Sequence, residues 1–220
     1  TSAAVANPAA PYPRMAPIDA YLMEPSQEIA LARSAAPNSI SKDATILVLT
    51  RTGYETAVTG TNGFVCMVGR GFSGAFDWPE RWNPRIRAAE CLNPPAARSV
   101  MPLARLRTAM ALAGRTTAET VDRLKTALRT GEIPPLEPGA MSYMMSKSSY
   151  LTHEVDRSMP HLMFFVPVED SPDWGANASD TPVIGGDYWF FTPGHEAEVP
   201  GLPSLTVFIV GGASWSDGTT

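Results

Sequence analysis

Two short apolar runs, residues 141–145 and 162–166, enclose the stretch that most restricts how this chain folds. Each run has the length of a strand and falls far below the ~20 residues that a membrane-spanning helix needs. The polar segment between them, with its border, carries two of the three histidines, His153 and His161. We expect both runs to be central strands, with residues 141–148 and 161–167 paired as a long hairpin.

A second group of strand patterns lies near residues 45–70. Residues 45–50 (TILVLT) form a continuous apolar run, as in strands buried on both faces. Residues 54–60 alternate, and Asn62-Gly63 precedes the pattern of residues 64–70. Because Asn-Gly favours a type I′ turn, these residues predict a three-stranded antiparallel meander.

Helical spacing appears in three places. Pro25 suits the first turn of a short helix over residues 24–36. Residues 96–114 repeat apolar side chains at helical spacing, and Thr116-x-x-Glu119 is a capping box that opens a second helix ending at Gly131. The last two form a predicted αα-hairpin near residues 97–130. Its solvent side should carry several arginines, namely Arg105, Arg107, Arg115, Arg123 and Arg129.

The remaining segments complete an α+β prediction. Residues 71–95 look irregular and residues 169–186 look like an acidic loop, whereas residues 188–192 and 205–210 read as the last strands. We therefore expect a mostly antiparallel sheet with the αα-hairpin packed on one face.

The N-terminal residues predict an extended tail and suggest that an export signal has been removed. Residues 1–17 are rich in Ala and Pro and cannot bury a regular face. We expect an extended tail over residues 1–20 and a single domain over residues 21–220. The start at Thr1, without Met, is what removal of an export signal would leave, so we expect a periplasmic or secreted protein.

The chain has two cysteines, Cys66 and Cys91. In an exported protein such a pair predicts one disulfide, which would stabilise the fold by about 3 kcal/mol in the chain-entropy picture. The alternative is two unrelated buried thiols.

Charge is unevenly distributed along the sequence. Residues 1–130 hold fifteen basic and ten acidic side chains, and residues 131–220 hold two basic and twelve acidic ones. Phosphate binding needs cations, so the C-terminal half is not expected to bind nucleic acid. No calcium-loop spacing appears, and no residue pattern identifies a cofactor.

An aromatic and arginine-rich loop offers one candidate binding site. Trp78, Arg81 and Trp82, with Tyr143 from the predicted central strand, are able to contact an aromatic or anionic small molecule by stacking and bidentate hydrogen bonds. The alternative, which we favour, is a long loop anchored by buried aromatic side chains.

Histidines and carboxylates offer a second candidate site. His161 with Glu154 or His153 suits acid–base chemistry, and His153, His161 and His195 are candidate metal ligands if they converge. A buried His161 bonded to a backbone carbonyl is the alternative. Ser146 and Lys147 are adjacent in a predicted strand, so they point to opposite faces and do not form a catalytic pair.

Three phrases carry a resemblance to a known family: GTNGFVCMV (60–68), GAMSYMMSK (139–147) and PHLMFFVP (160–167). They resemble a family of uncharacterised exported bacterial proteins, from about residue 24 to the C-terminus. The resemblance implies export and bacterial origin, and it transfers no activity. Three functions follow as expectations: a small-ligand-binding protein, a hydrolase that uses His161, and an envelope interaction protein.

Overall fold

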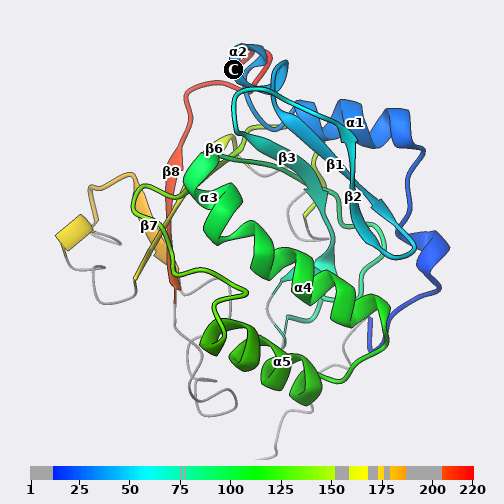
Figure 1. Cartoon of the computed structure of the whole chain (residues 1–220). Helices are drawn as coiled ribbons and strands as arrows, with labels where there is room; N and C mark the ends of the chain where they lie inside the picture. Colours follow the sequence, from blue (N-terminus) through cyan, green and yellow to red (C-terminus); the bar gives the residue numbers. More distant parts are fainter. Residues whose placement is uncertain are drawn as a thin grey trace, which may run out of the picture.

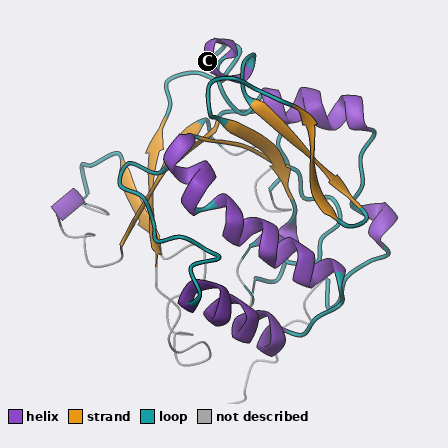
Figure 2. Cartoon of the chain, viewed as in Figure 1, coloured by secondary structure: helices purple, strands orange, loops and turns teal. Residues whose placement is uncertain are grey.

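The protein folds as helices packed on one eight-stranded sheet, within the residues that the computed structural model describes (Figures 1 and 2). These are residues 12–74, 76, 78–151, 159–167, 173–175, 179–186 and 205–220. The helices are η1 (Ile18–Ala20), α1 (Pro25–Arg33), α2 (Asn38–Ser41), η2 (Gly71–Ser73), α3 (Pro94–Ser99), α4 (Met101–Leu112) and α5 (Thr117–Arg129). The strands are β1 (Thr45–Thr50), β2 (Gly53–Val58), β3 (Val65–Gly69), β4 (Ala88–Leu92), β5 (Met141–Met144), β6 (His161–Pro167), β7 (Val183–Gly186) and β8 (Leu205–Gly211). The predicted α+β class is confirmed.

The strand order is β2-β1-β3-β4-β5-β6-β8-β7. Every neighbouring pair is antiparallel except β1 and β3, which run parallel and pair only at Thr45–Val65 and Ile46–Cys66. The sheet is therefore mostly antiparallel, as predicted. The three-stranded meander is wrong, because β3 lies beside β1 and not beside β2.

Burial explains why the meander does not form. Residues 66–69 of β3 are buried, whereas residues 55–57 of β2 are exposed, so β2 suits the edge of the sheet and β3 its interior. The Asn62-Gly63 segment consequently makes no two-residue hairpin turn. Its Asn62 side chain donates to the Ile40 carbonyl over 2.8 Å, and the Thr61 N–H donates to the Asp43 carbonyl over 2.8 Å. The chain thus crosses the start of β1.

Helices cover both faces of the sheet, not one face as predicted. We call these the α1 face and the α4 face. On the α1 face, Ile46 and Cys66 pack against Ala32. On the α4 face, Leu47 and Met67 pack in one core with Met101, and α5 lies against the outer side of α4 (Figure 1).

The first long helix predicted over residues 96–114 is two helices, α3 and α4. Pro102 lacks an N–H and its ring collides with a carbonyl one turn back, so the helix restarts near Val100. The second helix begins as predicted. The Thr116 side chain accepts from the Glu119 N–H, and the Glu119 carboxylate accepts from the Thr116 N–H.

Two strands fall where none was predicted. β4 lies in the segment expected to be irregular, and β7 ends the segment expected to be an acidic loop. β5 and β6 pair as expected, with Met144 opposite His161, and β8 matches the predicted last strand. The strand predicted at residues 188–192 lies outside the described residues.

The N-terminal segment packs on the core from residue 15 onward. Met15, Ala16 and Ile18 contact the apolar core of the α4 face, and the Ala16 N–H donates to the Tyr21 hydroxyl over 3.1 Å. The extended tail was predicted to reach residue 20, but the chain already packs on the core from residue 15. Residues 1–11 lie outside the described residues.

Candidate functional site

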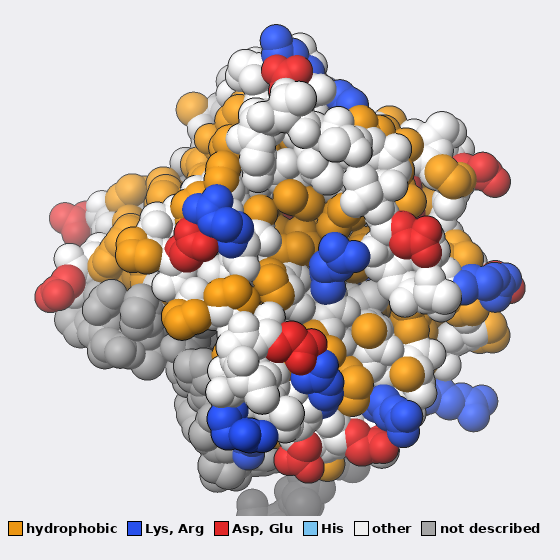
Figure 3. Space-filling model, viewed as in Figure 1, with side chains coloured by type: hydrophobic (Ala, Val, Ile, Leu, Met, Phe, Trp, Pro, Cys, Tyr) orange, Lys and Arg blue, Asp and Glu red, His pale blue; other side chains and the backbone are white. Residues whose placement is uncertain are grey.

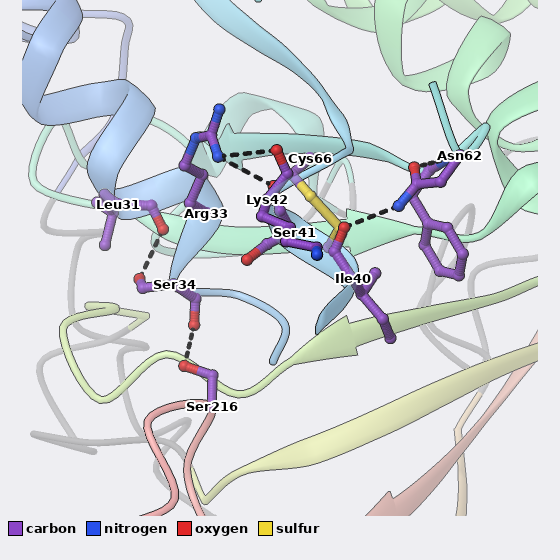
Figure 4. Close-up of a disulfide and its surroundings, with 11 residues drawn as sticks. Leu31, Arg33, Ser34, Ile40, Ser41, Lys42, Asn62, Cys66 and Ser216 are labelled. Atoms are coloured by element: carbon purple, nitrogen blue, oxygen red, sulfur yellow. Dashed lines mark hydrogen bonds between the residues drawn. A yellow bond between two sulfur atoms is a disulfide. The ribbon is translucent and has the colours of Figure 1, made fainter. Parts of the chain in front are cut away.

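The predicted disulfide between Cys66 and Cys91 is confirmed. The two residues face each other across the antiparallel pair β3–β4, on the α1 face, and both are fully buried. Figure 4 shows the bond among the end of α1, α2 and the turn that holds Asn62. Arg33 of α1 donates to the carbonyls of Ser41 and Lys42, which ties these segments together around the bond.

The aromatic loop brings Trp78, Arg81 and Trp82 into one region. The Arg81 guanidinium lies 4.7 Å from the Phe76 ring centroid and 4.9 Å from that of Trp82, and it donates to the Gly74 carbonyl over 3.0 Å. Trp78 packs against Gly74, where a Cβ would stand 2.8 Å from the indole. These contacts hold the loop onto itself, so the arginine and the rings are engaged with one another.

Arg107 of α4 also contacts Phe76 of this loop. It was expected to face solvent, but it is fully buried, with its guanidinium 4.6 Å from the Phe76 centroid and a hydrogen bond to the Gly74 carbonyl. Burial, together with the nearby Arg81 charge, lowers the pKa of Arg107 to about 9. The side chain was misassigned because an amphipathic pattern does not show which long polar side chain packs against a loop from elsewhere.

Tyr143 does not join the aromatic loop. It lies on the α1 face, where its ring is 6.3 Å from that of Phe64. Its neighbour Ser142 points to the α4 face, on which the aromatic loop packs. The four predicted ligand-binding residues are thus divided between the two faces of the sheet.

His161 begins β6 and is almost fully buried, with an exposed fraction of 6%. Its Nδ1 lies 2.7 Å from the Met159 carbonyl oxygen, and burial lowers its pKa. Its proposed companions Glu154, His153 and His195 lie outside the described residues. Among the described residues no three His, Cys, Asp or Glu side chains are placed to hold one metal ion.

A buried carboxyl that the sequence did not single out is the strongest functional feature. Glu90 of β4 lies opposite Met67 on the α4 face, and Ser142 of β5 lies diagonally beside it. Both side chains are at least 95% buried. Among the described residues, neither Glu90 Oε1 nor the Ser142 hydroxyl has a hydrogen-bond partner of good geometry, although the two groups lie close enough for Ser142 to lower the pKa of the carboxyl. We call this pair the Glu90 site.

Burial sets the protonation of the Glu90 site. Removing the carboxylate from water disfavours its charge, which raises the pKa of Glu90 to about 7, while the neighbouring Ser142 hydroxyl acts in the opposite direction. In the described part of the chain, no cation contributes to the pKa of Glu90. One sequence signal pointed here: a single Glu inside the otherwise apolar run of residues 88–92. It was missed because β4 itself was not predicted.

A second buried charged cluster has a structural explanation. Beyond Ile46 and Cys66, β1 and β3 separate, so their facing backbone groups lack strand partners. The Leu49 N–H donates to Glu28 Oε1 over 3.2 Å, and the Tyr54 hydroxyl and the Arg70 guanidinium donate to the Val68 carbonyl. We call this arrangement the β1–β3 wedge.

An ion pair closes the wedge. Arg70 lies 2.9 Å from Glu28 Oε1, and both side chains have no exposed surface. Arg70 Nε also donates to the Tyr21 carbonyl over 2.9 Å, whereas Glu28 Oε2 has no hydrogen-bond partner within the residues that the structure describes. The charges replace missing strand hydrogen bonds, and we assign the wedge to stability rather than binding.

Ser146 and Lys147 were expected within a strand, but β5 ends at Met144 and both residues follow it. The Ser146 hydroxyl lies 2.6 Å from that of Ser34, whereas Lys147 is half-exposed and pairs with Asp217. The Ser216 hydroxyl donates to the Ser34 carbonyl over 2.6 Å, as Figure 4 shows. We call Ser34, Ser146 and Ser216 the serine clasp, because it fastens the C-terminal residues to the end of α1.

None of the protein-family models, curated proteins or solved structures with which the chain was compared matches it. In the described part of the chain, no helix is both long and apolar enough to cross a membrane. Figure 3 shows that basic side chains on the face carrying α4 and α5 are scattered among acidic ones.

Proposed function

We propose that the protein binds a small molecule at the Glu90 site, between the sheet and the layer formed by α3, α4 and the aromatic loop. The observation that carries this proposal is the Oε1 of a carboxyl with an exposed fraction of 5%, for which the described residues offer no hydrogen-bond partner of good geometry. A buried polar atom without a hydrogen-bond partner lowers the stability of the fold by about 1–3 kcal/mol. Most buried polar atoms in proteins are therefore hydrogen-bonded to protein, water or ligand.

The chemistry of the site restricts the ligand. Ser142 offers a hydroxyl, Glu90 offers a carboxyl that is half-protonated near neutral pH, and the surrounding α4-face side chains are apolar. A ligand that donates hydrogen bonds from an amine or hydroxyl and carries an apolar body satisfies all three. Apolar side chains also reach the surface where α4 meets the strands, which suits the approach of such a molecule (Figure 3).

Thermal unfolding with a library of small amines, alcohols, amino acids and sugars tests the proposal. We expect at least one donor-bearing class to raise the melting temperature, and Glu90→Gln and Ser142→Ala to abolish that shift while Glu137→Gln, at an exposed ion pair, keeps it. A library without any hit, or a hit that both site variants retain, would contradict binding at Glu90.

We further propose that the protein works outside the cytosol, as the sequence suggested. The buried disulfide supports this, because such bonds persist in oxidising compartments. Alkylation of free thiols in fractionated cells, followed by mass spectrometry, should find Cys66 and Cys91 protected and only in the exported fraction. Finding the protein in the cytosolic fraction with Cys66 and Cys91 as free thiols would contradict the proposal that it works outside the cytosol.

A further inference from the structure

Three methionines surround His161 on the α4 face, at the place where β5, β6 and β8 lie side by side. Met144 of β5 and Gly211 of β8 are both register partners of His161, so all three point to the same face. Met163, two residues further along β6, shares that face. Met144 and Met163 have exposed fractions of only 9% and 4%, so both side chains lie inside the protein on the face that His161 occupies.

The third thioether reaches the same place from the segment before β6. A Cβ built on Gly211 would stand 2.9 Å from the terminal methyl of Met159. The Met159 side chain therefore lies over Gly211, on the opposite side of His161 from Met144. With an exposed fraction of 52%, Met159 also connects the cluster to solvent.

The hydrogen bond of His161 determines which ring nitrogen is available. A carbonyl oxygen only accepts, so Nδ1, 2.7 Å from the Met159 carbonyl, carries the proton. In the neutral ring Nε2 then holds a lone pair, and burial favours the neutral ring by lowering the pKa of His161. A backbone carbonyl that fixes one nitrogen while the other binds is the usual arrangement of a metal-ligating histidine.

We propose that Nε2 of His161 and the thioethers of Met144, Met159 and Met163 form a binding site for a soft monovalent cation, Cu(I). Thioether ligands select Cu(I), and imidazole is compatible with it, whereas Mg²⁺ and Ca²⁺ require oxygen ligands. The site shares no residue with the Glu90 site but adjoins it, because Met163 is the register partner of Ser142 on the same face. It retains only His161 from the three histidines considered as metal ligands in the sequence.

Competition between the full chain and the chromophoric chelator bicinchoninate, with Cu(I) kept reduced by ascorbate, tests the proposal. We expect one equivalent to bind, with Zn²⁺ unable to displace it. Met144→Leu and Met163→Leu keep the core volume and should each weaken binding at least tenfold, as should Met159→Leu at its partly exposed position. The matched control is Met67→Leu, a buried methionine on the same face but on β3, which should bind as the wild type does.

His161→Gln should remove the nitrogen ligand and weaken Cu(I) binding further. In the X-ray absorption spectrum of the Cu(I) complex, this variant should lack the nitrogen scatterer and keep the sulfur scatterers. Each variant is first compared with the wild type by circular dichroism; because Met159 is partly exposed, Met159→Leu tests the site even if a core variant fails to fold. Absence of stoichiometric Cu(I) binding, or equal binding by Met67→Leu and the other methionine variants, would overturn the proposal and leave the methionines as core residues.

Discussion

Removing the charge of Glu28 should destabilise the fold by about 3 kcal/mol, the lower part of the range found when one partner of a buried ion pair is lost. Glu28→Gln is a clean perturbation of the β1–β3 wedge. The amide oxygen still accepts from the Leu49 N–H, and the amide nitrogen takes the place of Oε2, which has no partner to lose. What remains is the buried Arg70 charge, which then donates only to neutral oxygens: the amide oxygen in the Oε1 position and the Tyr21 and Val68 carbonyls.

Urea unfolding of the oxidised protein measures the effect. With a slope of about 2–3 kcal/mol per molar urea for a domain of this size, the midpoint should fall by about 1–1.5 M. Glu137→Gln removes an equivalent carboxylate from the exposed pair with Arg98, and its midpoint should not move measurably. Equal midpoints for the two variants would refute the assignment of the wedge to stability.

A double-variant cycle isolates the ion pair itself. Arg70→Met alone leaves the Glu28 carboxylate buried without its cation and should cost about 3–5 kcal/mol. Combined with Glu28→Gln, the total should be clearly smaller than the sum of the two single effects, since no uncompensated charge remains. Additive effects would show that the two side chains contribute independently.

Three further predictions concern other parts of the fold. Glu90 has a folded-state pKa of about 7, above its ordinary 4.5. Its contribution to stability is therefore fully present below about pH 4.5, and about 3 kcal/mol of it is lost as the pH rises through 7. The free energy of unfolding of Glu90→Gln should lack this pH-dependent loss. Replacing both cysteines by alanine should cost about 3 kcal/mol in urea, given the 25-residue separation of the disulfide, and a midpoint equal to that of the wild type would contradict this. Thr116→Ala should lower stability by about 1 kcal/mol through loss of the α5 cap, and Thr116→Ser should restore it.

Local signals predicted most individual elements. The apolar run of residues 45–50, the capping box at Thr116 and the last strand depend on neighbouring residues alone, and all three appear in the structure. Strand order could not be predicted in the same way. Asn62-Gly63 favours a hairpin locally, but the burial of residues 66–69 on both faces requires an interior position, and this tertiary demand prevails.

The candidate sites were predictable only in part. Cys66 and Cys91 were paired correctly because the chain has no other cysteine. The aromatic loop residues do gather, yet Tyr143 was grouped with them although alternation along β5 sends it to the other face. Glu90 and Ser142 escaped notice because their significance lies in lacking partners, and only three-dimensional packing shows which atoms have partners.

The serine clasp sets an order on folding. Ser34 and Ser216 lie 182 positions apart, and their hydrogen bond joins the first long helix to residues near the end of the described chain. The Ser216 N–H also donates to the Met145 carbonyl, and the Met145 N–H donates to the Ala35 carbonyl, so three distant segments close together. This closure cannot form before the segment that holds Ser216 has been synthesised. The end of α1 and the residues after β5 therefore reach their final contacts late in folding, after the longest interval of chain has been made.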